Sequence, residues 1–325
     1  GPARVIPREL PGVTCRTIDV TLPPAQRGWR RGRGDADLLE GCVSCILEEM
    51  LAELGSSDAA LRGGRRYELG TRAVPLEPSD TWAESAPKGG VWFITGGFGG
   101  IGLSVGEKLA RETGAKLVLA SRSPLPDRSE WDRTLRDSPP HCAIVRRIEA
   151  VRLLEAAGAD VMVATADVCN VSQMRAAIAA ATERFGPIHG VIHAAGVIDD
   201  APLLTKDVSS VENVFSAKIH GTQVLDSVFP DGSVKQMVLF SSTSTITAPA
   251  GQIDYVAANE YLNAYAKARN GDATRVIAIN WGIWKDVGMA AEAIAERHGD
   301  VPRFAPRPVD LPLLDETTFD EAGNR

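Results

Sequence analysis

From residue 90 onward the sequence alternates short apolar runs with helical stretches, and this alternation restricts the fold more than any other feature. Alternating strands and helices are typical of a parallel sheet whose helices cross over between strands. The runs are almost wholly apolar, as in strands covered on both faces. We therefore expect an α/β fold with a doubly wound parallel sheet. The predicted strands are 91–95, 116–121, 160–165, 190–193, 236–241 and 275–280, and the predicted helices are 101–112, 147–157, 171–184, 208–228 and 252–268.

The first 88 residues form a smaller unit without a nucleotide-binding signature. Residues 12–22 and 66–76 alternate like strands, and residues 35–54 are amphipathic like a helix. This is too little for an independent catalytic core. Cys42 and Cys45 form a C-x-x-C pair in that helix, but no second ligand pair accompanies them. We interpret both as core-facing and expect no metal site.

The composition of the whole chain argues against several classes of function. A formal net charge of -7 gives no general attraction to nucleic acid or to an anionic membrane. No apolar run approaches the roughly 20 residues of a membrane-spanning helix, and the first residues show no signal-peptide pattern. The five cysteines are scattered and odd in number, unlike a disulfide framework. We therefore expect a cytoplasmic protein.

A glycine-rich turn joins the predicted strand 91–95 to the predicted helix 101–112. Gly97, Gly99 and Gly102 follow the G-x-G-x-x-G spacing between a predicted strand and a predicted helix. Glycines permit a tight turn and let backbone N–H groups approach a pyrophosphate at the helix N-terminus. A glycine-rich turn without a ligand is the alternative. We predict a Rossmann-type dinucleotide site formed by Thr95, Gly96, Gly97, Phe98, Gly99, Gly100, Ile101 and Gly102.

The end of the second strand favours NADPH over NADH. An NAD site usually has an acidic residue there for the ribose 2′-hydroxyl, whereas this strand ends in Ser121 and Arg122. A guanidinium and a hydroxyl suit the charge and the acceptors of a 2′-phosphate. Arg122 as a solvated surface side chain is the alternative.

The next two strand ends supply the rest of the predicted cofactor site. After the third strand, the carboxylate of Asp167 could meet the adenine amine, with Val168 beside it. After the fourth strand, small residues would let the backbone pass close to the cofactor. We interpret His193, just before them, as buried and hydrogen-bonded and not as catalytic. The small residues are Ala194, Ala195 and Gly196.

Four polar residues form the candidate catalytic set. Ser242 ends the fifth strand, Tyr255 begins the next helix, and Asn259 follows one turn later, while Lys218 lies on the preceding helix. Hydride reduction of a ketone creates a developing alkoxide, which needs a proton and hydrogen-bond donors. A phenol can supply the proton, a serine hydroxyl can orient the carbonyl, and a nearby ammonium lowers the pKa of the tyrosine. Each residue alone would more often be structural; beside the glycine turn they predict a reductase.

These segments resemble the ketoreductase domain of polyketide synthases, within the short-chain dehydrogenase/reductase superfamily, over roughly residues 90–290. Most short-chain reductases carry a lysine four residues after the tyrosine. The polyketide-synthase group exchanges that lysine with an asparagine, as Lys218 and Asn259 do here. The first 88 residues, with RYELGTRAVPLEP, resemble a shortened form of the family's catalytically silent structural subdomain. The matching segments are TGGFGGIG (95–102), ASR (120–122), ADV (166–168), HAAGVIDD (193–200), FSAKIHGT (215–222), LFSSTST (239–245) and residues 255–259.

The resemblance implies a role for each candidate residue. Tyr255 would donate the proton and Ser242 would bind the substrate carbonyl. Lys218 would tune the tyrosine and hold the ribose, and Asn259 would support the relay. The substrate would be a β-ketoacyl thioester on the phosphopantetheine arm of an acyl carrier protein, and the product a β-hydroxyacyl thioester.

The resemblance also implies a stereochemical type. Ile198, Asp199 and Asp200 resemble the Leu-Asp-Asp motif of B-type ketoreductases, which form the D-configured hydroxyl. The tryptophan of A-type members, eight residues before the tyrosine, is Thr247 here, and the proline of epimerising B-type members is Ala257. We expect B-type reduction without epimerisation. An ordinary solvated turn at the two aspartates is the alternative.

The resemblance implies that residues 280–284 touch the nicotinamide and that a helix at 290–298 forms a lid over the substrate. After the lid the sequence departs from the family. Residues 299–325 lack the family's further strand, and LPLLDE (311–316) resembles the beginning of a neighbouring synthase domain such as a dehydratase. We expect a structural subdomain at 1–88, a catalytic domain at 89–300 and a linker at 301–325.

Two other functions remain as alternatives. A redox-silent scaffold or an epimerase-only domain would typically lack the cofactor glycines, the tyrosine or the serine, all of which are present. A free-standing reductase of small ketones or sugars would be expected to lack the first 88 residues and the exchange of lysine and asparagine.

Overall fold

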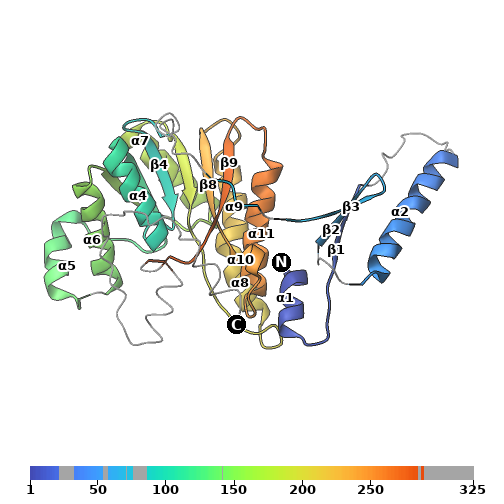
Figure 1. The fold of residues 1–325 in the computed structure, drawn as a ribbon. Coiled ribbons are helices and arrows are strands. Elements are labelled where there is room, and N and C mark those ends of the chain that lie inside the picture. The colour runs from blue at the N-terminus through green and yellow to red at the C-terminus, as the bar shows by residue number, and fades with distance from the viewer. Residues whose placement is uncertain are drawn as a thin grey trace.

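The main body of the protein is built on a six-stranded parallel sheet (Figure 1). The computed structural model describes residues 1–21, 33–53, 58–70, 72–75, 86–140, 142–284 and 287–288. The strand order is β6-β5-β4-β7-β8-β9, which is the predicted doubly wound α/β arrangement. The strands are β4 (Val91–Thr95), β5 (Lys116–Ser121), β6 (Asp160–Thr165), β7 (Gly190–His193), β8 (Gln236–Ser242) and β9 (Arg275–Trp281).

Helices cover both faces of this sheet. Successive side chains of a strand point to opposite faces, so Phe93 belongs to one hydrophobic layer and Ile94 to the other. One layer is completed by α7 (Val171–Phe185), α9 (Gly221–Val228) and α11 (Ile253–Ala268). The other is completed by α4 (Gly100–Thr113) and α6 (Ala143–Ala156). Burial on both faces explains why the strands are apolar throughout.

The polar segment between β5 and α6 contains ordered structure. It forms a 3-10 turn, η1 (Arg128–Glu130), and the helix α5 (Trp131–Asp137). Trp131 is 5% exposed and donates from its indole nitrogen to the carbonyl of Pro126 at 2.9 Å. One buried aromatic ring thus attaches a polar segment to the body, and α6 begins four residues before its predicted start.

The long helix predicted over residues 208–228 is interrupted in its middle. It runs as α8 (Val208–Phe215), a π-helical turn η2 (Ser216–His220) and α9. Asp207 caps its start by accepting from the backbone N–H of Ser210 at 2.7 Å. A π turn is rare and often marks a functional site, and this one contains Lys218.

The N-terminal residues form a separate three-stranded sheet with two helices (Figure 1). β1 pairs with β2 in parallel and β2 pairs with β3 antiparallel. Both predicted strands are shorter than expected, and β2 was not predicted. The elements are α1 (Pro2–Glu9), β1 (Thr17–Val20), α2 (Arg33–Leu51), β2 (Asp58–Arg62) and β3 (Arg65–Glu68).

Helix α1 joins this unit to the main body. Val5 is fully buried in a cluster with Ile253 and Val256 of α11. The carboxylate of Glu9 accepts from the backbone N–H groups of Leu203, at 2.5 Å, and Gly251, at 2.8 Å. The N-terminal unit therefore contacts both the loop that contains Leu203 and the loop just before α11.

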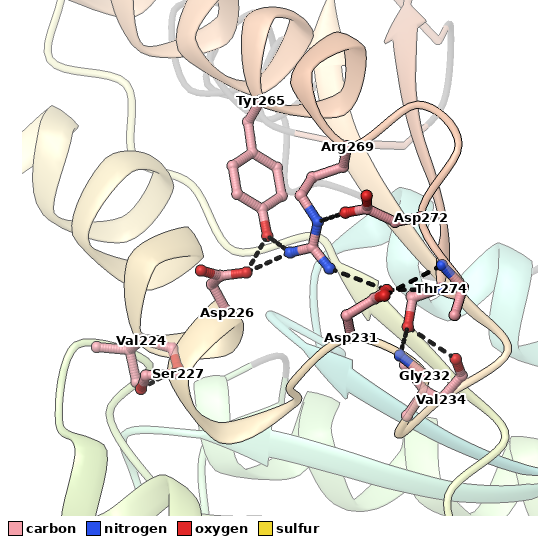
Figure 2. Close-up of polar contacts among 11 residues, drawn as sticks. Val224, Asp226, Ser227, Asp231, Gly232, Val234, Tyr265, Arg269, Asp272 and Thr274 are labelled. Carbon is pink, nitrogen blue, oxygen red and sulfur yellow. Dashed lines mark hydrogen bonds and ion pairs between the residues drawn. The ribbon is translucent and has the colours of Figure 1, made fainter.

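The C-terminal end of α11 is fixed by a polar network around Arg269 (Figure 2). Its guanidinium forms ion pairs with Asp226, Asp231 and Asp272 and donates to the hydroxyl of Tyr265 at 2.7 Å. The network connects α9, the loop before β8 and the loop before β9.

No helix in the described residues is long and apolar enough to cross a membrane.

Candidate active site

The glycine turn has a backbone geometry that only glycine can satisfy at its first position. Gly96 has φ of 65°, and a Cβ atom there would lie 2.6 Å from the backbone nitrogen of Ala195. Gly99 donates from its N–H to the carbonyl of Gly96 at 2.9 Å, and α4 begins at Gly100. The turn therefore presents a helix N-terminus at the carboxyl edge of the sheet, where a pyrophosphate binds in doubly wound folds.

A cleft of about 660 Å³ runs along this edge and contains most of the predicted site residues. The carboxyl ends of the five strands from β4 to β8 all contribute to its wall. Among the predicted residues Gly97, Asp199, Asp200 and Asn259 are not part of the lining. Within the described residues no group of three or more histidine, cysteine or acidic side chains could hold a metal ion.

Two arginines without acidic partners in the described residues lie near the end of β5. Arg122 is exposed and lines the cleft. Arg147, from α6, donates to the hydroxyl of Ser121 at 2.7 Å, and its guanidinium lies 4.4 Å from the ring centroid of Phe98. Neither arginine forms an ion pair within the described part of the chain. Sequence reasoning missed Arg147, because nothing in the helical pattern distinguishes it from Arg146 or Arg152.

The ends of β6 and β7 form the middle of the cleft. One carboxylate oxygen of Asp167 accepts from the backbone N–H of Cys169 at 2.9 Å, and both residues line the cleft with Val168. Burial raises the pKa of the Cys169 thiol to about 11, so the thiol stays protonated. The small residues Ala194, Ala195 and Gly196 also line the cleft.

His193 is buried and hydrogen-bonded, as predicted. It is 1% exposed, and its Nδ1 atom is 2.7 Å from the hydroxyl of Thr95. Burial lowers the pKa of His193 to about 3, assisted by the nearby charge of Lys218. The imidazole is therefore neutral near neutral pH.

Three candidate catalytic side chains lie together at the cleft. Tyr255 and Ser242 line it, and Asn259 lies beside it. Burial raises the pKa of Tyr255, while hydrogen bonding by the side chains of Ser242 and Asn259 acts in the opposite direction. Asn259 is fully buried and donates from Nδ2 to the backbone carbonyl of Tyr255 at 2.8 Å. Its Oδ1 atom is buried with no hydrogen-bond partner in the described residues. An orphaned acceptor beside the tyrosine leaves a place for a donor that the described residues do not supply.

Lys218 approaches the same tyrosine from the π turn. It is 3% exposed, donates from Nζ to the carbonyl of Phe240 at 2.7 Å, and places Nζ 5.7 Å from the ring centroid of Tyr255. Burial lowers the pKa of Lys218 to about 7. The structure thus brings together all four residues of the predicted catalytic set.

The loop with the two aspartates is anchored by residues that sequence reasoning did not identify. Asp200 accepts from the amide of Gln252 at 2.8 Å, and the backbone carbonyl of Asp199 accepts from Lys206. Lys206 in turn forms a buried ion pair with Asp254, which directly precedes Tyr255. Only Ile198 of the three loop residues lines the cleft. The anchoring depends on contacts 48 and 52 residues apart in sequence, which no local pattern predicts.

Aromatic residues close the end of the cleft beside β9. Trp281 packs edge-on against Phe240 at 5.3 Å and against Trp284 at 5.4 Å between ring centroids. All three line the cleft. The lid helix predicted at 290–298 and the C-terminal segment 301–325 lie outside the described residues.

Comparison with known proteins agrees with this geometry. The model of the KR domain family matches residues 90–286. The chain is 36% identical over 249 residues to a phenolphthiocerol/phthiocerol polyketide synthase of Mycobacterium tuberculosis, covering 76% of this chain and 13% of that protein. It is 35% identical over 201 residues to 6-methylsalicylic acid synthase of Aspergillus terreus, covering 62% of this chain and 11% of that protein. The chain thus spans only about an eighth of these curated relatives.

The chain is also similar to solved structures of ketoreductases. The ketoreductase from the first module of phoslactomycin biosynthesis in Streptomyces sp. HK803 superposes with a TM-score of 0.67 and 27% identity, covering 90% of this chain and 61% of that one. A structure of A-type ketoreductases from a modular polyketide synthase gives a TM-score of 0.66 and 29% identity, covering 91% of this chain and 56% of that one. The family is an oxidoreductase family of the short-chain dehydrogenase/reductase type, whose members bind a nicotinamide cofactor. From its sheet, its cleft and these matches, the chain belongs to the ketoreductase domain family of polyketide synthases.

Proposed function

We propose that this chain is an NADPH-dependent ketoreductase that reduces a β-ketoacyl thioester, held on the phosphopantetheine arm of an acyl carrier protein, to the β-hydroxyacyl thioester. The observation that carries the proposal is the meeting of Tyr255, Ser242 and Lys218 in one cleft with the glycine turn. A phenol, a hydroxyl and an ammonium beside a dinucleotide site are the groups that carbonyl reduction requires.

The residues present fit a nicotinamide dinucleotide. The turn at Gly96 has no room for a Cβ atom, so its backbone can approach a pyrophosphate. Arg122, with no acidic partner in the described residues, suits a 2′-phosphate. When bound, the cofactor would supply the hydride. The other residues proposed to hold it are Thr95, Gly97, Phe98, Gly99, Gly100, Ile101, Gly102, Ser121, Asp167, Val168, Ala194, Ala195 and Gly196.

Each catalytic side chain would act on the carbonyl or on its neighbour. The hydroxyl of Ser242 would donate a hydrogen bond to the substrate carbonyl oxygen and orient it. The phenol of Tyr255 would give its proton to that oxygen as negative charge develops there. The ammonium of Lys218 would stabilise the phenolate that remains, because an adjacent positive charge favours the ionised form. Asn259 would hold the backbone of α11 in place and offer its free acceptor to the proton relay.

We infer B-type stereochemistry without epimerisation. The loop Ile198–Asp200 resembles the B-type motif, Thr247 stands where A-type members have tryptophan, and Ala257 stands where epimerising members have proline. The anchoring of Asp200 by Gln252 supports a fixed position of this loop at the rim of the cleft. The D-configured hydroxyl is the expected product.

The curated relatives are polyketide synthases much longer than this chain, so neighbouring domains are the expected setting. We propose an acyl carrier protein as the partner that delivers the substrate, and a dehydratase as one neighbouring domain. We also propose the division into a structural subdomain (1–88), a catalytic domain (89–300) and a linker (301–325). The contacts of Glu9 with Leu203 and Gly251 support a bracing role for the first part.

The test is reduction of a β-ketoacyl N-acetylcysteamine thioester and of the same acyl group on an acyl carrier protein. We expect NADPH absorbance to fall with both substrates, and chiral chromatography to give the D-configured product. A folded protein that binds NADPH and oxidises none of it would favour a redox-silent scaffold. The L-configured product would overturn the B-type assignment and leave the reductase assignment intact.

A further inference from the structure

Arg147 occupies the junction between the glycine turn and the end of β5. Its Nη2 atom donates to the hydroxyl of Ser121 at 2.7 Å and to the carbonyl of Ser123 at 2.5 Å. The flat guanidinium lies over the ring of Phe98, 4.4 Å from its centroid. Phe98 and Ser121 both line the cleft. One arginine thus contacts the residue at the pyrophosphate turn and the residue at the predicted ribose corner.

The positive charge of the Arg147 guanidinium is not neutralised by any described side chain around it. No carboxylate lies within ion-pair distance of it in the described residues. Other arginines of this region behave differently, since Arg128 pairs with Glu155 and Arg152 pairs with Asp132. The Nε atom of Arg147 is buried with no hydrogen-bond partner in that part of the chain. Burial lowers the pKa of Arg147, and no acidic group opposes the shift. A half-buried cation without a counter-charge is costly unless an anion binds beside it.

We propose that Arg147 is a second cationic determinant, beside Arg122, for the 2′-phosphate of the cofactor, and that it acts through Ser121. The inference rests on the proposed use of NADPH. It adds a residue from α6, which the strand-end pattern at residues 120–122 does not include.

The hydrogen bonds explain how Arg147 would act. Ser121 accepts from Arg147, so its own proton remains available for an anion. In the structure that proton is directed to the carbonyl of Ser123 at 3.3 Å, a long contact that is easily exchanged. A phosphate oxygen at this corner would therefore receive a hydrogen bond from Ser121 and the field of two guanidinium groups. A cofactor with a free 2′-hydroxyl would gain neither charge interaction.

The test measures binding of two half-cofactors and not turnover. Affinities for 2′,5′-ADP and for 5′-AMP are measured by isothermal titration calorimetry on the wild type, Arg147→Gln and Arg147→Met. The methionine variant keeps an apolar stem against Phe98 and removes the charge. We expect wild type to prefer 2′,5′-ADP, and each variant to lose at least about tenfold of that preference with its 5′-AMP affinity unchanged.

The neighbouring Arg146→Gln is the matched control, because it removes the same charge from the same helix without touching Ser121. It should keep the wild-type preference. An unchanged preference in either folded Arg147 variant would overturn the role of Arg147 while leaving NADPH use in place. A wild type without any preference for 2′,5′-ADP would overturn the NADPH assignment, and this inference with it. Unchanged 5′-AMP affinity shows that a variant is folded.

Discussion

Lys206 and Asp254 form an ion pair of 2.7 Å between side chains that are only 1% and 2% exposed. Lys206 also donates to the backbone carbonyl of Asp199. Asp254 accepts from the backbone N–H of Tyr255 at 2.9 Å through its other oxygen. One buried pair therefore connects the loop of the stereochemical motif to the first turn of the helix that carries the proposed proton donor.

Removing one partner of this pair should destabilise the protein strongly. Lys206→Met leaves the carboxylate of Asp254 buried without its counter-charge, and such a change costs about 3–5 kcal/mol. We expect that loss in the free energy of unfolding, measured by urea denaturation. Lys108→Met is the control, because Lys108 pairs with Glu112 on an exposed helix face, and such pairs contribute about 0.5 kcal/mol or less. Equal losses in the free energy of unfolding of the two variants would show that the buried pair stabilises the protein no more than an exposed pair does.

Tyr255→Phe should slow reduction strongly without weakening cofactor binding. The substitution removes only the hydroxyl, and loss of a general acid typically lowers kcat by about 10²–10⁴. We expect a fall in kcat of that size, with the Kd for NADPH unchanged by fluorescence titration. Tyr261→Phe is the control, since Tyr261 stacks on Tyr265 at 6.4 Å and does not line the cleft. Wild-type kcat in Tyr255→Phe would remove the assigned role.

The sheet and the glycine turn could be predicted from sequence because their causes are local. Strands buried on both faces must be apolar, and a turn such as that at Gly96 excludes every side chain. The six predicted strands of the main sheet agree with the structure to within one residue at each end. The strand β2 was missed because its sequence, DAALR, is short and has no strong alternation.

The rest of the site could not be predicted because its causes lie far apart in the sequence. Lys206 and Asp254 are 48 residues apart, and Arg147 and Ser121 are 26 apart. Surface lysines and arginines outnumber buried ones, so composition favours a solvated role for each. The π turn at Lys218 depends on packing against α11 and β8, which a helical period cannot reveal.

Lys218 should make the stability of the protein depend on pH. Burial lowers its pKa to about 7 in the folded state, whereas an unfolded lysine has a pKa near 10.4. Below pH 7 the Lys218 side chain is charged in both the folded and the unfolded protein, so the free-energy cost of burying its charge is fully present. As pH rises from 7 to about 10, the unfolded state binds more protons than the folded state, so stability rises by at most about 1.4 kcal/mol per pH unit.

The measurement compares the free energy of unfolding between pH 7 and 10 for the wild type and Lys218→Met. His193 faces Lys218 but stays neutral in this range, because its pKa is about 3. Burial raises the pKa of Tyr255 in the folded state. Its titration therefore affects only the upper end of the range, where the unfolded tyrosine ionises near pH 10, and this contribution is shared by the wild type and the variant. We expect the variant to have the smaller slope. Lys235→Met, which changes an exposed lysine, should keep the slope of the wild type, and equal slopes in all three proteins would mean that Lys218 is not desolvated.

Arg269→Met should loosen the C-terminal end of α11 (Figure 2). The side chain is 16% exposed and neutralises three carboxylates that come from three different segments. Without it, Asp226, Asp231 and Asp272 would repel one another, and Tyr265 would lose a donor. We expect a loss of about 1–3 kcal/mol in the free energy of unfolding. Arg184→Met, which removes one exposed pair with Asp160, should cost about 1 kcal/mol or less. The network includes none of the residues that line the cleft. We therefore expect kcat to be unchanged in Arg269→Met at temperatures where the variant is folded. A large fall in kcat under these conditions would mean that the network also positions α11 for catalysis.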